Sequence, residues 1–143
     1  MKSIIRFLIY SNIWVAFCAL GLTISTEVLF GTANFKVSQF VFFATIFSYN
    51  FQRIVRLKKE QKHVRKDWLN QHRLAIYLLI LVGGVMSLYR FINFRLSTQV
   101  AIIFSGCLSI LYPFGLRRIP FLKIFIISLV WATSTLLLLV LEN

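Results

Sequence analysis

The segment LAIYLLILVGGVMSLYRFI, residues 74–92, contains a single charged residue, Arg90. A helix of about 20 apolar residues can cross the roughly 30 Å hydrocarbon core of a bilayer, so this segment is predicted to be a transmembrane helix. The rest of the chain has the same character. Of its 143 residues 59% are hydrophobic, and its mean hydropathy is +0.80, well above the roughly half-apolar composition of soluble domains.

Four further apolar segments flank this one, and no linker or repeat divides the chain. We therefore expect one integral membrane domain, residues 1–143, with an all-α fold: a polytopic transmembrane helix bundle of about five spans. The first apolar segment is too long for a signal peptide and lacks a clear cleavage site, so we expect it to be retained. The predicted spans are residues 4–30, 37–55, 74–92, 97–114 and 121–141.

The charged residues predict the orientation of these spans. Sixteen Lys and Arg oppose four Asp and Glu, which gives a net charge of +12. All the basic residues except Lys36, Arg90 and Arg95 lie near the N-terminus or in the connections that follow the second and fourth spans. We expect the chain to be integral to the cell (inner or plasma) membrane. The positive-inside rule then places these basic regions and the N-terminus in the cytoplasm and the C-terminus outside. Because topology accounts for the charge, we expect membrane lipids and not nucleic acid as partners.

The second span carries a polar helical face formed by Gln39, Phe43, Ile46, Asn50 and Arg53, at spacings of four, three, four and three. We expect this face to point into the bundle. Polar residues at membrane depth are candidates for a functional site. The alternative is an interhelical hydrogen bond for Asn50 and a snorkelling, topology-marking role for Arg53.

Small residues on two other spans favour close helix packing over a binding role, because they let helix backbones approach. Glu27, near the outer end of the first span, is assigned no role because water can reach that end easily. The small and hydroxyl-bearing residues that favour packing are Gly83, Gly84 and Ser87 on the third span, and Ser105, Gly106, Ser109 and Tyr112 on the fourth.

The sequence contains no common catalytic motif and no carboxylate pair at membrane depth. Glu60 and Asp67 lie among Lys and Arg residues, which favours solvated ion pairs over a metal site. Cys18 and Cys107 lie in apolar segments without metal-type spacing, so we expect reduced, structural thiols. We predict no catalytic residue and no metal ligand.

Two strings resemble the first half of the UbiA superfamily of membrane prenyltransferases: FFATIFSYNFQRIVRLKK, residues 42–59, and LYPFGLRRIPFLKIFIISLVWA, residues 111–132. In that family the second helix ends in an Asn followed by spaced aspartates, and a later Tyr-Pro loop with basic residues leads into an apolar helix with a Trp. Asn50 matches the Asn. The residues that match the later element are Tyr112, Pro113, Arg117, Arg118 and Trp131.

The family's three aspartates are absent, since Phe51, Ile54 and Lys58 stand in their places. In the family the aspartates hold Mg²⁺ that bridges a prenyl diphosphate, a task that needs oxygen ligands. The family fold also has nine helices and a second aspartate-rich loop. The resemblance therefore implies a UbiA-like half without the metal site, and Mg²⁺ as a cofactor only if the chain is a prenyltransferase.

Our main hypothesis is a degenerate UbiA-like membrane protein that binds an anionic lipid or isoprenoid phosphate at its basic cytoplasmic face. One alternative is a prenyltransferase, or part of one, that acts on a lipid or aromatic acceptor. Another is a structural or assembly subunit that contacts a second membrane protein or another copy of itself. The residues proposed to bind the phosphate or lipid headgroup are Asn50, Arg53, Arg56, Lys58, Arg117, Arg118 and Lys123.

Overall fold

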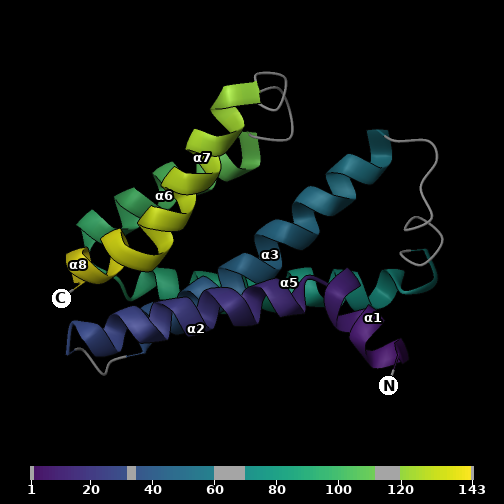
Figure 1. Cartoon of the computed structure of the whole chain (residues 1–143), viewed down its shortest axis with the longest axis horizontal. Coiled ribbons are helices and arrows are strands. Elements are labelled where there is room, and N and C mark those ends of the chain that lie inside the picture. Colours follow the sequence, from purple (N-terminus) through teal and green to yellow (C-terminus); the bar gives the residue numbers. More distant parts are fainter. Residues whose placement is uncertain (1, 32–34, 60–69, 112–119, 143) are drawn as a thin grey trace.

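The computed structural model describes residues 2–31, 35–59, 70–111 and 120–142, and these residues are mainly helical (Figure 1). The all-α prediction is confirmed. The elements are α1 (Lys2–Tyr10), α2 (Ile13–Leu29), α3 (Lys36–Lys59), α5 (Arg73–Ile92), α6 (Leu96–Leu111), α7 (Pro120–Ala132), the π-helical segment η2 (Thr133–Leu137) and α8 (Leu138–Glu142).

Two helical stretches in the described part of the chain are long and apolar enough to cross a membrane: Arg73–Ile92 and the continuous stretch Ile124–Glu142. The bent pair Ile4–Tyr10 and Ile13–Leu29 would make a third. The prediction of about five spans is thus supported for two or three of them. Of the other two predicted spans, α6 has 16 residues, and the longer α3 carries amide and basic side chains.

The first predicted span is broken. Helices α1 and α2 meet at an angle of 71°, and Asn12, between them, has a φ of 58°. This left-handed conformation is uncommon for residues other than glycine, but asparagine adopts it more readily than most. The apolar segment 4–30 therefore contains two helices that point in different directions.

The helices form two arms that meet at one end and diverge at the other (Figure 1). Helices α2 and α5 lie along one arm, and α6 with α7 forms the other. Helix α3 packs against α5 and α2 and rises between the arms. We call the two ends of the molecule the closed end, where α2 ends and α6 begins, and the wide end, where α3 ends and α7 begins.

The main cluster of buried apolar residues lies at the closed end. It joins α2, α3, α8 and the turn after α5, and it includes Ala19, Val41 and Leu138. Phe40 and Phe94 meet edge to face within it, with ring centroids 5.4 Å apart and ring planes at 83°. Because this core holds the arms together at one end, the space between them widens toward the other.

The two acidic residues in the described part of the chain lie near the N-termini of helices at the closed end. Glu27 is only 2% exposed, and its Oε1 accepts a hydrogen bond from the backbone N–H of Ser38 in the first turn of α3, at 3.3 Å. Glu142 accepts from the backbone N–H of Arg95 at 3.3 Å and from Oγ1 of Thr98 at 3.0 Å. Carboxylates satisfy free N–H groups and oppose the helix dipole at such positions. The expectation of an easily solvated Glu27 without a role was wrong.

Candidate functional site

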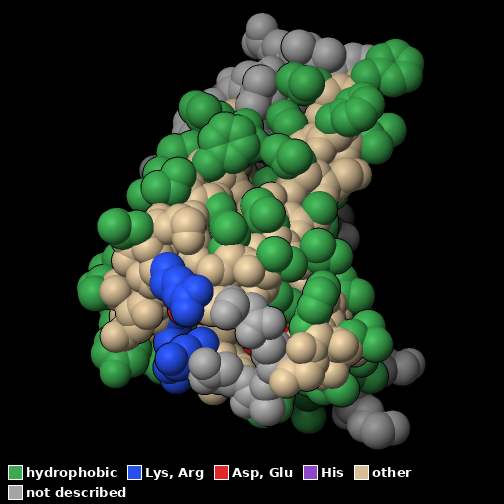
Figure 2. Space-filling view, turned by 90° about the vertical axis from the view of Figure 1, so that its left-hand side faces the viewer, with side chains coloured by type: hydrophobic (Ala, Val, Ile, Leu, Met, Phe, Trp, Pro, Cys, Tyr) green, Lys and Arg blue, Asp and Glu red, His purple; other side chains and the backbone are tan. Residues whose placement is uncertain are grey.

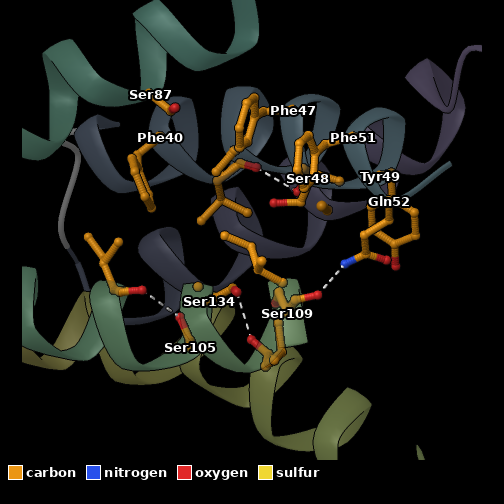
Figure 3. Close-up of a pocket in the computed structure, with 18 of the residues that line it drawn as sticks. Phe40, Phe47, Ser48, Tyr49, Phe51, Gln52, Ser87, Ser105, Ser109 and Ser134 are labelled. Carbon is orange, nitrogen blue, oxygen red and sulfur yellow. Dashed lines mark hydrogen bonds between the residues drawn. The ribbon is translucent and has the colours of Figure 1, made fainter. Parts of the chain in front are cut away.

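A cavity of about 630 Å³ separates α3 and α5 from α6, α7 and the start of α8. Its wall is mainly apolar and includes Phe40, Phe47 and Phe51 of α3 (Figure 3) together with Trp131 of α7. Ligand cavities in proteins are typically about 300–1,000 Å³ and mostly apolar. The cavity therefore has the size and the surface to hold a lipid chain.

Serine hydroxyl groups interrupt this apolar wall (Figure 3). Ser87 of α5, Ser105 of α6 and Ser134 of η2 each line the cavity. Each donates a hydrogen bond to a carbonyl oxygen three or four residues earlier in its own helix, at 3.0, 3.2 and 2.7 Å respectively. Since these donors are already satisfied, an apolar chain can lie against them without leaving a buried donor unpaired.

Gln52 connects α3 to the arm of α6 and α7 across the cavity. Its Nε2 donates a hydrogen bond to the backbone oxygen of Ser109, at 2.8 Å (Figure 3). Gln52 lies two turns before the end of α3 at Lys59, and Ser109 lies close to the end of α6 at Leu111. This bond therefore limits how far the arms separate toward the wide end.

The glycines of α5 and α6 have different surroundings. A Cβ atom on Gly83 would lie 3.0 Å from the backbone oxygen of Phe43 and 3.2 Å from the backbone nitrogen of Phe47. The predicted packing role is confirmed there, because α5 touches the backbone of α3. A Cβ atom on Gly106 would meet nothing within 4 Å, and Gly106 lines the cavity. The prediction of close packing was wrong for this glycine of α6.

Asn50 holds the break between α1 and α2. It is completely buried, and its Nδ2 donates to the backbone oxygens of Ser11 and Ile46, both at 2.9 Å. Nδ2 of Asn12 approaches Oδ1 of Asn50 at 3.5 Å. These contacts correspond to the interhelical hydrogen bond considered as the alternative to a ligand site.

Arg53 takes part in the same cluster, since its guanidinium donates to Oδ1 of Asn12 at 3.0 Å. The other members of the predicted polar face differ in how deeply they are buried. Ile46 is buried and Phe43 is half-buried, but Gln39 is exposed. The face thus points into the bundle over its C-terminal part only, and Gln39 was predicted wrongly.

The remaining predicted site residues belong to the segments at the wide end. For Arg56, Lys58 and Lys123 only the helical positions are described, and Arg117 and Arg118 lie outside the described residues, as do Tyr112 and Pro113. Arg56 follows the cavity residue Gln52 by one turn of α3. Lys123 precedes the cavity residue Ile127 by one turn of α7. These two basic positions therefore lie toward the same end of the cavity.

Sequence reasoning missed that Thr45, Ser48 and Gln52 form a second polar line on α3, at spacings of three and four, and that all three line the cavity. The spacing was visible in the sequence. The sequence does not show whether this line or the line through Asn50 faces the cavity, because either could face a neighbouring helix. Among the described residues no group of three or more His, Cys, Asp and Glu is placed to hold a metal ion.

No family model matches this chain, and neither a curated protein nor a solved structure matches it.

Proposed function

We propose that this chain is an integral membrane protein that binds an anionic lipid, with the lipid chain in the cavity and the phosphate group at the wide end. An isoprenoid phosphate is the class we favour. The observation that carries the proposal is the cavity itself, a mainly apolar space with basic positions of α3 and α7 toward its wide end. A phosphate-bearing lipid has the same two parts, an apolar chain and a charged head that Lys and Arg bind.

The surface of the molecule supports insertion into a membrane. Large apolar side chains such as Leu74, Leu81 and Phe125 are between 63% and 77% exposed, and monomeric soluble proteins rarely expose extended apolar patches. Helix α3 has 24 residues and is about 36 Å long at 1.5 Å per residue. The amides of Asn50 and Gln52 need not face lipid, because they donate to the backbone oxygens of Ser11 and Ser109. We propose that α3 and α6 also span the membrane, giving about five spans with the N-terminus in the cytoplasm.

The favoured isoprenoid class follows from the resemblance to the UbiA superfamily, and we retain that relationship as part of the proposal. Phe51 occupies the position of the family's first aspartate. Its ring stacks on that of Phe47, with centroids 5.8 Å apart and planes at 14°, and both rings line the cavity. An aromatic wall at this position favours retention of a chain over the metal-assisted transfer that the aspartates perform, so we propose binding and not catalysis.

The cavity can be tested by filling it. Gly106 and Gly21 are both helical glycines at which an added Cβ atom would meet nothing within 4 Å, but only Gly106 lines the cavity. The full chain, immobilised in neutral detergent, would be equilibrated with undecaprenyl phosphate, and the retained lipid measured. We expect Gly106→Leu to lower the affinity about tenfold, which corresponds to about 1.4 kcal/mol, and Gly21→Leu to leave it unchanged. Equal affinities for the two variants would refute the cavity as the binding site.

The headgroup requires a separate measurement. Replacing Arg117 and Arg118 together by Gln should weaken retention of undecaprenyl phosphate but not of the uncharged alcohol undecaprenol. Arg53 is left intact, because its guanidinium holds Asn12 and its loss would disturb the helix break. If the double variant retained undecaprenyl phosphate as well as the unchanged protein does, the phosphate would not bind at these residues.

A further inference from the structure

We propose that a second phosphate-binding site lies at the closed end of the molecule, in a pocket formed by the start of α3 and the end of α5. This pocket has a volume of about 240 Å³ and is separate from the cavity between the arms. Figure 2 shows Lys and Arg side chains gathered in one patch on this face, next to hydrophobic side chains. The residues that line the pocket are Lys36, Tyr89, Arg90, Asn93 and Phe94.

The packing of α3 against α5 brings the two cations together. The helices are antiparallel, and Gly83 lies against the backbone of Phe43. Seven residues, or about two turns, lead back from Phe43 to Lys36 and forward from Gly83 to Arg90. Both steps run toward the closed end, so the close approach at Gly83 sets Lys36 opposite Arg90. In the sequence these two residues are 54 positions apart.

The positive charge of this pocket is not neutralised by the described part of the protein. Nε of Arg90 is buried and has no hydrogen-bond partner there. Neither Lys36 nor Arg90 forms an ion pair with a described residue. The acids of this end, Glu27 and Glu142, accept hydrogen bonds at the N-termini of α3 and α6. Two cations that line one pocket without an ion-pair partner attract an anion from outside the protein.

The donors in the pocket suit a phosphate group better than a carboxylate or a halide. A guanidinium presents several N–H donors in one plane and binds phosphate oxygens in pairs, while an ammonium adds a point charge. Asn93 donates one amide hydrogen to the backbone oxygen of Tyr89 at 2.8 Å, which leaves its second hydrogen for a ligand. The guanidinium of Arg90 lies 5.8 Å from the centre of the Tyr89 ring, and this contact helps to fix its orientation.

The same chemistry could come from a lipid headgroup or from free phosphate. Phe94 gives the pocket an apolar side, and exposed apolar residues such as Ile92 and Leu96 flank it in the chain. A lipid would place its phosphate on Lys36 and Arg90 and its chains along these residues. Free phosphate would bind to the cations alone, whereas a lipid would also need the apolar residues.

The test compares the double variant Lys36→Gln/Arg90→Gln with Arg95→Gln. Arg95 is an exposed cation at the same end of the molecule that does not line the pocket. The full chain in neutral detergent would be equilibrated with mixed detergent micelles that contain phosphatidylglycerol or diacylglycerol, and separately titrated with inorganic phosphate by calorimetry. We expect the double variant to bind phosphatidylglycerol at least about tenfold more weakly, or about 1.4 kcal/mol, and Arg95→Gln to bind like the unchanged protein.

The arms of this experiment separate the outcomes. Binding of phosphatidylglycerol without binding of inorganic phosphate identifies a lipid headgroup site, and binding of both identifies a general phosphate site. Lys36→Arg/Arg90→Lys keeps both charges and should retain most of the binding, which guards against a loss caused by misfolding. The double variant is also compared in the Gly106→Leu background, where the cavity is filled and the loss caused by Lys36→Gln/Arg90→Gln should be the same, so failure of the cavity proposal would not affect this result. An equal loss for Arg95→Gln and the double variant, or no loss for either, would overturn the proposal.

Discussion

Replacement of Asn50 by leucine tests whether its buried amide holds the break between α1 and α2. Leucine has a similar size but offers no hydrogen bond, so the backbone oxygen of Ser11 would lose the donor that lies 2.9 Å away. Ser11 is completely buried, and water cannot easily replace that donor. The oxygen of Ile46, the second acceptor, belongs to the same helix as Asn50.

The expected cost is about 2 kcal/mol, because leaving one buried polar group unsatisfied costs about 1–3 kcal/mol and interhelical hydrogen bonds in membranes contribute about 0.6–2 kcal/mol. This is a change of about thirtyfold in the unfolding equilibrium constant. The assay is reversible unfolding in mixed micelles, followed by far-ultraviolet circular dichroism. A spin label on Ile9 would also show whether α1 becomes more mobile relative to α3.

Gln39→Leu is the matched control, since it removes an exposed amide from the same helix and should change the free energy of unfolding by less than about 0.5 kcal/mol. If Asn50→Leu were as stable as Gln39→Leu, and α1 kept its mobility, the hydrogen bonds of Asn50 would not be what fixes the break.

Three further predictions concern packing, helix ends and charge. Gly83→Ala should destabilise the protein by about 1–3 kcal/mol because its Cβ would press on the backbone of α3, whereas Gly106→Ala should be neutral or stabilising by up to about 1 kcal/mol. If the packing were misassigned, the same unfolding assay would show Gly83→Ala to be the more stable variant. Glu142→Leu removes the acceptor for the Thr98 hydroxyl and for the backbone N–H of Arg95, just before α6. Amide hydrogen exchange at Arg95 and in the first turn of α6 should therefore increase by a factor that corresponds to about 0.5–2 kcal/mol, and unchanged exchange would contradict the capping role. The net charge of +12 should raise Tm in bilayers that contain phosphatidylglycerol relative to neutral bilayers, and added salt should reduce the difference if it arises from exposed charges.

The sequence predicted individual helices better than their directions. The apolar run 74–92 agrees with α5, Arg73–Ile92, because an unbroken run bounded by a charged residue and an asparagine leaves little choice of ends. The run 4–30 looked equally continuous. Its break depends on Asn12 in a left-handed conformation and on a donor from Asn50, and no local pattern shows that a residue 38 positions after Asn12 will supply it.

The candidate site was harder to predict than the helices. Small residues at Gly83 and Gly106 have the same local appearance, and small residues at a helix surface indicate close packing when a second backbone lies opposite. Phe43 lies opposite Gly83, but nothing does so at Gly106. The difference is set by the angle between the arms, which results from where the apolar core lies. Helical periodicity gives the direction of a side chain and not the distance to its neighbour.

The placement of the acids bears on the two anion-binding sites that we propose. Glu27 and Glu142 accept hydrogen bonds at the N-termini of α3 and α6, where a carboxylate opposes the positive end of the helix dipole. Lys36 and Arg90 line a pocket at the same end, and their charges would attract an external anion there. Anionic lipids attract basic residues at a membrane surface, and each Lys or Arg near it gains about 1 kcal/mol from them. We infer that the excess of basic residues serves the binding of lipid phosphates as well as the orientation of the helices, because orientation alone would not require Lys36 and Arg90 to line one pocket.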